Sequence, residues 1–296
     1  MSKQIKADIL LLLITVIWGT SFPLMKNVLD YIPSFAYLSL RFIIATVVLL
    51  VVFHKKLKLM NKAALIYGSL IGLMLFGAMA LQVSGLYFTT ASNSAFITGL
   101  NVVMVPVVSA VFLRKKPGAA STIGVLMAFG GLFFLSGGLD FKFNFGDLLT
   151  LLCAVCVTFQ IILIDKFTND QDAALLSVIQ VGSVAVFSLI TWTGVGYKSF
   201  EFNWTVAITL FITGVLGTAL AFAGQTIVQK NTSPTHTALI FTAEPVFGAL
   251  FALIIPNSQG MVESLKLNTV AGCGLILAGM LISELKLGKR QAEYLQ

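Results

Sequence analysis

The amino-acid sequence predicts an all-α integral membrane protein with ten transmembrane helices, arranged as two inverted five-helix repeats. The prediction rests on long apolar runs, on the uneven placement of lysine and arginine between them, and on a weak similarity between the two halves. Of the 296 residues, 57% are hydrophobic and only 10% are charged, and the mean hydropathy is +0.95. Soluble domains average about 25% charged residues. A soluble core could not bury this much apolar surface, so lipid is the expected solvent.

The apolar runs give the ten spans, because one membrane-spanning helix needs about 20 mostly apolar residues. The stretch between Lys62 and Arg114 carries no formal charge and is too long for one helix. Its polar segment 89–93 divides it into a tight hairpin. Other spans end at proline or glycine, as at Pro33 and Gly118. The predicted spans are residues 7–27, 33–53, 62–87, 91–113, 119–137, 146–165, 173–195, 204–229, 233–256 and 266–284.

The basic residues predict the orientation, because cytoplasmic loops are enriched in lysine and arginine. With both termini inside, 14 basic residues fall in inner segments and 4 in outer ones. One inner loop, with Asp165, Lys166, Asp170 and Asp172, is net acidic, but acidic residues count little in this rule. The inner set is Lys3, Lys6, Lys55, Lys56, Lys58, Lys62, Arg114, Lys115, Lys116, Lys166, Lys230, Lys286, Lys289 and Arg290, and the outer set is Lys26, Lys142, Lys198 and Lys266.

This distribution also bears on partners and location. The net charge of +7 could indicate a nucleic-acid partner, but the basic residues form short clusters between apolar runs and no long basic stripe. The expected partners are therefore the lipid bilayer and a small-molecule solute, not nucleic acid. We expect a multi-pass protein of the cell (plasma) membrane with both termini cytoplasmic, present as a monomer or a homodimer.

The two halves of the chain, 1–138 and 139–296, match weakly but in order. Chance matching among apolar helices is the alternative explanation, although several pairs involve polar residues that are scarce here. Since five helices is an odd number, the second copy must enter the membrane from the opposite side, which is typical of secondary transporters with a site near the midplane. A shift of 139 pairs Asp8 with Asp147 and Arg41 with Gln180; a shift of 143 pairs Gln82 with Gln225 and Asn101 with Glu244; a shift of 148 pairs Gly124 with Gly272 and Gly131 with Gly279.

Four short motifs occur in order along the chain: Trp18-Gly19-Thr20-Ser21-Phe22, Leu40-Arg41-Phe42, Ala243-Glu244-Pro245-Val246-Phe247 and the pair Gly272…Gly279. Together they resemble the EamA-like family of the drug/metabolite transporter superfamily over nearly the whole chain. The resemblance implies two five-helix repeats and export or exchange of amino acids and other small metabolites without ATP. In agreement, the chain lacks the G-x-x-x-x-G-K-[ST] phosphate-binding signature.

The chain departs from that family pattern in two places. Members often have an acidic residue just after the fourth span, where this chain has Arg114-Lys115-Lys116. The segment Pro256–Lys266 after the ninth span is longer than usual. Both departures leave the fold prediction intact and weaken inference about the solute.

Two ionisable residues fall deep within predicted spans, where charge is costly and usually functional. Glu244 lies 11 residues from the start and 12 residues from the end of the ninth span, and Arg41 lies 8 residues inside the second. At 1.5 Å per residue their depths differ by about 4 Å, so they could form an ion pair. Functionally, Glu244 would titrate with coupled protons or bind a substrate ammonium, and Arg41 would bind a carboxylate. The structural alternative is a fixed ion pair that holds the bundle together.

Other polar and aromatic residues complete the predicted substrate-binding set. Trp18 could stack on a substrate or pack structurally. Prolines within spans, Pro23, Pro106 and Pro245, each free a carbonyl and could form hinges or static kinks. Amides at lipid depth would suit a polar or zwitterionic solute, or would form interhelical hydrogen bonds; they are Gln82, Asn101, Gln160, Gln180 and Gln225.

Other function classes have less support. Cys153 and Cys156 form a C-x-x-C within an uncharged run, where a reactive thiolate is not expected, and the two histidines, His54 and His236, are too few for a buried metal site. We therefore predict no cofactor, no metal and no catalytic residues. A membrane-embedded enzyme would need clustered catalytic groups at depth, and a channel or receptor-like scaffold is the other alternative.

Overall fold

The computed structural model describes residues 3–89, 91–114, 117–135, 144–194, 199–254 and 266–293, and these residues contain helices and no strand. Residues 1–2 and 294–296, the basic pair 115–116 and most of the long segment after the ninth span lie outside the described residues. The helices of the first half are α1 (Lys3–Val28), α2 (Ser34–Val52), the 3-10 helix η1 (His54–Leu59), α3 (Lys62–Gly85), α4 (Ala91–Gly99), α5 (Asn101–Phe112) and α6 (Ala119–Leu135).

The second half contains the remaining helices. Its helices are α7 (Phe145–Phe167), α8 (Ala173–Gly194), α9 (Trp204–Phe211), the π-helix η3 (Ile212–Leu220), α10 (Ala221–Gln229), α11 (Pro234–Phe241), α12 (Ala243–Ala252) and α13 (Leu267–Glu293). The segments α9, η3 and α10 follow one another directly and make one long rod.

Seven helical stretches among the described residues are long and apolar enough to cross a membrane. Two shorter apolar helices, Ala119–Leu135 and Leu267–Ser283, accompany them. This confirms an all-helical, multi-pass membrane protein. Helix occupies every one of the ten predicted ranges, although the range 233–256 holds two short helices, α11 and α12.

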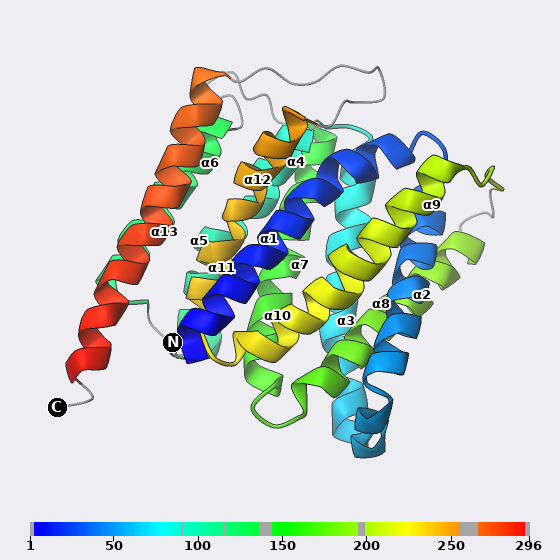
Figure 1. Cartoon of the computed structure of the whole chain (residues 1–296), viewed down its shortest axis with the longest axis horizontal. Coiled ribbons are helices and arrows are strands. Elements are labelled where there is room, and N and C mark those ends of the chain that lie inside the picture. The colour runs from blue at the N-terminus through cyan, green and yellow to red at the C-terminus, as the bar shows by residue number, and fades with distance from the viewer. Residues whose placement is uncertain are drawn as a thin grey trace.

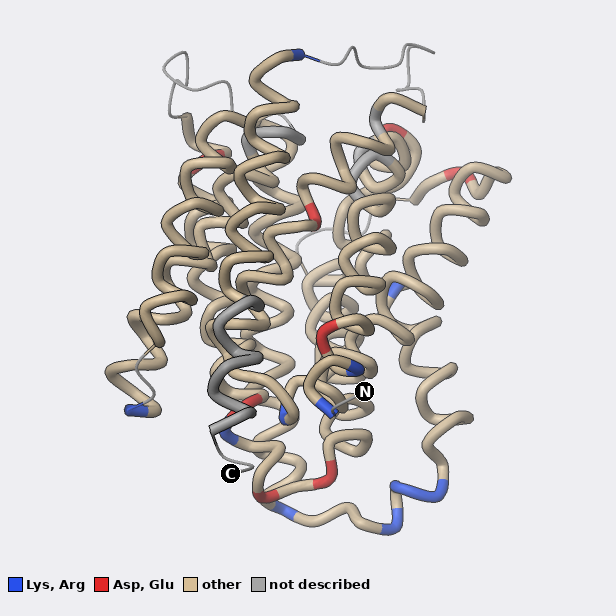
Figure 2. Tube along the Cα trace, turned by 60° about the vertical axis from the view of Figure 1, so that its left-hand side comes forward, with Lys and Arg blue, Asp and Glu red and all other residues tan. Residues whose placement is uncertain are grey.

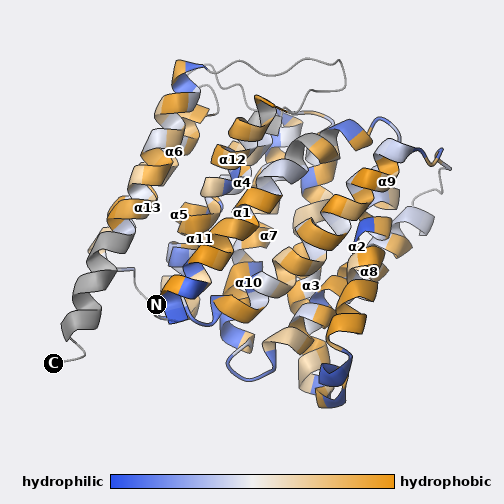
Figure 3. Ribbon diagram, viewed as in Figure 1, coloured by the Kyte–Doolittle hydropathy of each residue, from blue (hydrophilic) through white to orange (hydrophobic). Residues whose placement is uncertain are grey.

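The outer surface of the bundle is apolar, as lipid requires. Val111 is 70% exposed, Val51 69% and Leu126 62%, and aliphatic side chains seldom cover the surface of a soluble monomer so densely. Figure 3 shows the hydrophobic residues along the middle of the helices and the hydrophilic ones mainly at their ends, above all at η1.

The first residue of α1 and the last residue of α13 lie at the same end of the bundle. Figure 1 shows α1 beginning and α13 ending there, on the side where the turns α2–α3 and α7–α8 also lie. Figure 2 shows most lysine and arginine residues gathered at this same end. The arrangement agrees with the uneven distribution of basic residues along the sequence.

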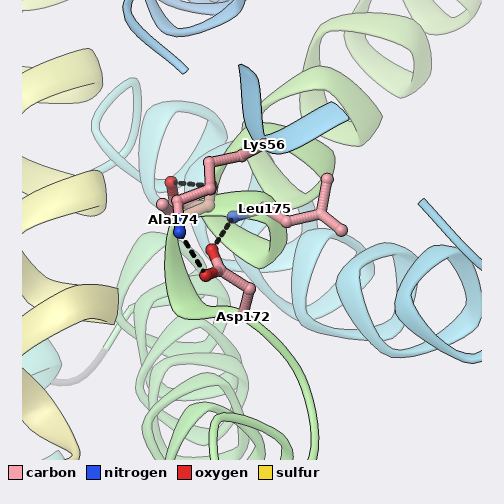
Figure 4. A network of polar contacts seen from close by, with 5 residues as sticks. Lys56, Asp172, Ala174 and Leu175 are labelled. Atoms are coloured by element: carbon pink, nitrogen blue, oxygen red, sulfur yellow. Dashed lines mark hydrogen bonds and ion pairs between the residues drawn. The ribbon is translucent and has the colours of Figure 1, made fainter. Parts of the chain in front are cut away.

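A small polar network joins two turns at this basic end (Figure 4). Lys56 Nζ lies 2.8 Å from Asp172 Oδ2, and Asp172 accepts hydrogen bonds from the backbone N–H groups of Ala174 and Leu175 at the start of α8. Burial acts to raise the pKa of Asp172, but the hydrogen bond from Lys56, the two backbone hydrogen bonds and the charge of Lys56 together lower it below its usual value. This carboxylate therefore caps α8 in its ionised form.

Two rods are interrupted at matching places. Leu100 separates α4 from α5, and Thr242 separates α11 from α12. The breaks are 142 residues apart, within one residue of the shift that pairs Asn101 with Glu244. In the second rod Pro245 is the third residue of α12 and has no N–H for the carbonyl of Phe241, which favours a break there.

Helices α6 and α13 pack along one edge of the bundle (Figure 1) through glycine. A Cβ at Gly124 would lie 2.6 Å from the carbonyl oxygen of Gly279, and one at Gly131 2.6 Å from that of Gly272. The sequence pairs Gly124 with Gly272 and Gly131 with Gly279, so each glycine contacts the counterpart of the other. Such a reciprocal contact is what a local two-fold axis between equivalent helices produces.

Candidate solute-binding cavity

One cavity lies inside the bundle, between helices of both halves. Its volume is about 70 Å³, well above the roughly 10–15 Å³ that a cavity needs to hold one water molecule. The cavity is lined by Trp18, Ser21, Met25, Arg41, Leu75, Ala78, Met79, Gln82, Thr98, Asn101, Val157, Gln160, Phe222, Gln225, Phe241 and Glu244.

Seven of the eight residues predicted to bind the solute line this cavity: Trp18, Arg41, Gln82, Asn101, Gln160, Gln225 and Glu244. The eighth, Gln180, is fully buried elsewhere and donates a hydrogen bond from Nε2 to Thr226 Oγ1 at 2.6 Å. Two polar lining residues, Ser21 and Thr98, were not predicted. Ser21 belongs to the Trp18–Phe22 motif, and Thr98 precedes Asn101 by three residues. Their closeness in sequence to predicted site residues could have identified both as residues that line the cavity.

Arg41 is 4% exposed and is held by the π-helix opposite it. Its Nε donates to Thr218 Oγ1 at 2.7 Å, and Nη2 approaches the carbonyl oxygen of Gly217 at 3.4 Å. Nη1 lies 3.5 Å from Tyr37 Oη. The two long contacts are weak, so the guanidinium has one firm hydrogen bond and keeps donor capacity for a ligand.

Trp18 shares the same backbone acceptor. Its Nε1 donates to the carbonyl oxygen of Gly217 at 2.9 Å, and its ring lies against Phe222 and Phe241 with centroids 5.2 Å and 5.0 Å away. The π-helix therefore presents one carbonyl to both Trp18 and Arg41. Isolated π-type turns are common at functional sites.

Glu244 lies in the first turn of α12 and is only partly buried, because it faces the cavity. Among the described residues, none donates a hydrogen bond to its carboxylate or forms an ion pair with it. Arg41 acts on Glu244 through its charge, but the two do not meet within the 4.0 Å of a salt bridge. A carboxylate inside the bundle is costly without a partner, and the cavity is the space that this carboxylate faces.

Asn101, at the break between α4 and α5, also has a side-chain oxygen without a hydrogen-bond partner among the described residues. It is 5% exposed, and this oxygen is Oδ1. Asn101 begins α5 as Glu244 lies at the start of α12. The two helix breaks thus bring the residues paired by the repeat to one cavity.

Three amides form a chain that starts at the cavity wall. Gln160 and Gln225 pair through their side chains, with Gln225 Nε2 3.1 Å from Gln160 Oε1. Gln225 also donates to Gln229 Oε1 at 3.2 Å, and Gln229 donates to the carbonyl oxygen of Ile161 at 2.6 Å. Gln82 is more weakly held, 3.4 Å from Thr98 Oγ1. Interhelical hydrogen bonding therefore engages part of the predicted amide set.

The described residues contain no group of three or more histidine, cysteine, aspartate or glutamate side chains that could hold a metal ion. The cavity offers one cation, one anion, amides and aromatic rings. Such a lining suits reversible binding of a small polar molecule.

Comparison with known proteins identifies the family. The model of the EamA-like transporter family matches the chain twice, over residues 5–137 and 144–285. The chain belongs to the EamA-like transporter family. It is therefore a transporter in a membrane, with a small-molecule solute as its partner.

Several known proteins resemble it over most of their length. A protein of Archaeoglobus fulgidus named as an uncharacterized transporter is 33% identical over 288 residues, which cover 96% of this chain and 87% of the relative. The uncharacterized transporter YyaM of Bacillus subtilis is 27% identical, with 94% and 93% covered. A solved crystal structure with 17% identity superposes with a TM-score of 0.79 over 95% of this chain and shows the shared fold.

Proposed function

We propose that this EamA-like chain is a secondary transporter that exports or exchanges small polar metabolites, with amino acids as the best-fitting class. One observation carries the proposal: Arg41 from the first half and Glu244 from the second line the same cavity without pairing. A zwitterion would place its carboxylate at Arg41, whose planar fork matches that group, and its ammonium at Glu244.

The groups that line the cavity support this class of solute. The unpartnered Asn101 Oδ1 offers an acceptor, and Trp18 and Phe241 offer apolar faces. Sugars and nucleosides would not require the opposed charges.

The architecture of the proposal is two inverted five-helix repeats, residues 1–138 and 139–296, with ten membrane crossings. The two matches of the family model, the matching helix breaks and the reciprocal contacts of Gly124 and Gly131 with α13 support it. We place the protein in the plasma membrane with both termini cytoplasmic, because the basic residues gather at their end of the bundle.

Proton coupling is a further part of the proposal and rests on Glu244. A coupled carrier needs a group that loses and regains a proton as the cavity faces each side in turn. Glu244 faces the cavity, has no hydrogen-bond partner among the described residues, and sits at a helix break. It can therefore exchange between a proton and a substrate ammonium.

Binding and flux experiments with matched solutes test the proposal. The purified protein would be melted with an amino acid, the corresponding amine, the corresponding carboxylate, a sugar and a nucleoside. We expect the amino acid to raise the melting temperature most and to show saturable flux in proteoliposomes. Equal stabilisation by amine and amino acid would remove the role of Arg41, and flux that never saturates would indicate a channel.

A further inference from the structure

A buried hydrogen bond joins the residue after α3 to α7 at the end of the bundle away from the start of α1. Thr89, after α3, donates from Oγ1 to Asp147 Oδ1 of α7 at 2.6 Å, and the N–H of Asn144 donates to Asp147 Oδ2 at 2.8 Å. Asp147 is 0% exposed. Beside it the backbones touch, since a Cβ at Gly146 would lie 2.6 Å from the carbonyl oxygen of Gly85.

The internal repeat supplies a counterpart for each partner in this bond. The shift of 139 pairs Asp147 with Asp8 near the start of α1. The shift of 143, which pairs Gln82 with Gln225, pairs Thr89 with Thr232 in the turn between α10 and α11. The counterpart of the Thr89–Asp147 bond is thus a Thr232–Asp8 bond at the end of the bundle where the chain begins.

That counterpart bond is not made in this structure. Asp8 Oδ1, Asp8 Oδ2 and Thr232 Oγ1 are all buried and have no hydrogen-bond partner within the described residues. Asp8 lies 3.5 Å from His236 Nε2 of α11, an ionic contact that leaves its oxygens without a hydrogen bond. Buried polar atoms normally have hydrogen-bond partners, so three such atoms without a hydrogen bond, at positions that the repeat relates to Thr89 and Asp147, point to an interaction made in another conformation.

We propose that Thr89–Asp147 and Thr232–Asp8 are two equivalent latches that close alternately, one at each end of the cavity. This inference rests on the carrier function proposed above. In an inverted repeat the two halves exchange conformations when the cavity changes sides, so a contact made by one half becomes the contact of the other. The present conformer holds the Thr89–Asp147 latch closed; in the opposite conformer Thr232 donates to Asp8 and Thr89 releases Asp147.

Cross-linking at one end with a mutation at the other tests the coupling. Asp8→Cys and Thr232→Cys are introduced after replacing Cys153, Cys156 and Cys273, and the rate of bridging by a short bifunctional thiol reagent is measured in proteoliposomes. Thr89→Val removes the distant donor, so the rate should rise roughly tenfold, the effect of losing one hydrogen bond to a charged group. Thr89→Ser keeps the donor and should give the parental rate.

A matched control tests whether loss of any threonine hydroxyl changes the cross-linking rate, and a second variant tests the same hydrogen bond from the side of its acceptor. Thr122→Val removes a hydroxyl whose one hydrogen bond among the described residues goes to the carbonyl oxygen of Gly118 in its own turn, and it should leave the rate unchanged. Should Thr89→Val fold poorly, Asp147→Asn weakens the same acceptor and should raise the rate less, in the same direction. Equal rates in the valine and serine variants, or in Asp147→Asn and its parent, overturn the proposal.

Flux measured in the same vesicles separates this inference from the proposed function. A cross-linking rate that responds to Thr89→Val in a protein that carries no solute supports the latches and contradicts the carrier function. Saturable flux in a protein whose cross-linking rate does not respond contradicts the latches alone.

Discussion

Arg41 of α2 and Glu244 of α12 line one cavity, yet no ion pair within 4.0 Å joins these two described residues. Arg41 is held instead by Thr218, and Glu244 has no protein hydrogen-bond partner among the described residues. A buried ion pair would neutralise both groups and leave little for a ligand. Held apart, they keep opposite charges available to one solute.

The first prediction concerns Arg41→Lys, which keeps the positive charge but loses the planar fork. Apparent affinity for an amino acid should weaken by roughly tenfold, the loss of one charge-assisted hydrogen bond. Affinity for an amine without a carboxylate should be unchanged. Melting in the presence of each solute measures both effects, and equal weakening for the two solutes would assign Arg41 a structural role.

The second prediction concerns orientation. In a protein without its native cysteines, Lys58→Cys in η1 should resist an impermeant thiol reagent in intact cells, and Glu201→Cys in the turn before α9 should react. Both positions are exposed, so a difference in labelling reports the side of the membrane and not burial. The reverse pattern would place the termini outside.

The third prediction uses two neighbouring glycines in α6. A methyl group at Gly131 would meet the carbonyl oxygen of Gly272 at 2.6 Å, whereas one at Gly130 would meet nothing within 4 Å. Gly131→Ala should therefore destabilise the protein by about 1–3 kcal/mol through overpacking. Gly130→Ala should be neutral or stabilising by up to about 1 kcal/mol, since alanine favours helix. Melting in detergent compares them, and similar losses would show that α6 and α13 do not pack this closely.

The fourth prediction concerns pH and Asp172. Because its pKa is lower in the folded protein than usual, its contribution is fully present above the unfolded value of about 3.9. The contribution is lost as pH falls through the lower folded value. At neutral pH, Asp172→Asn keeps a capping oxygen and should cost less than about 1 kcal/mol, since the side chain of Lys56 is 44% exposed.

A second variant separates the cap from the charge. Asp172→Ala removes the capping acceptor as well and should cost about 1 kcal/mol more. Denaturation at neutral pH and in acid measures both variants. A cost for Asp172→Asn that persists below the folded pKa of Asp172 would contradict the electrostatic origin.

Apolar run length alone located the helices, because a membrane span leaves little freedom in length or in backbone pairing. It did not reveal the π-helix at Ile212–Leu220, since no side-chain pattern marks a change in backbone hydrogen bonding. Nor did it show that two rods are interrupted, between α4 and α5 and between α11 and α12, although Pro245 marked the second place.

The sequence alone does not show which of the buried amide side chains line the cavity. Gln160 and Gln180 both lie at membrane depth and both are buried, but only Gln160 reaches the cavity. The lipid-facing surface and the helix–helix contacts are both apolar, so the sequence does not say which inward face borders the cavity. The unmade Thr232–Asp8 contact likewise required the tertiary structure, because both residues are ordinary polar groups near a helix end.

The last prediction concerns Glu244→Gln, which is nearly isosteric and permanently neutral. Because Arg41 keeps its contacts with Thr218, Gly217 and Tyr37, the substitution strands no ion-pair partner. The melting temperature should therefore change little, and Arg41→Gln should not rescue the variant.

The variant should still bind solute but lose the dependence of transport on a pH gradient, or lose net transport while keeping exchange. Detergent melting and pH-driven flux of both single variants and the double variant measure these effects. A structural pair predicts the opposite pattern, in which Glu244→Gln melts early and the double variant recovers. A well-folded Glu244→Gln protein with the parental pH response would remove Glu244 from proton coupling, because a permanently neutral side chain cannot carry the proton that drives the cycle.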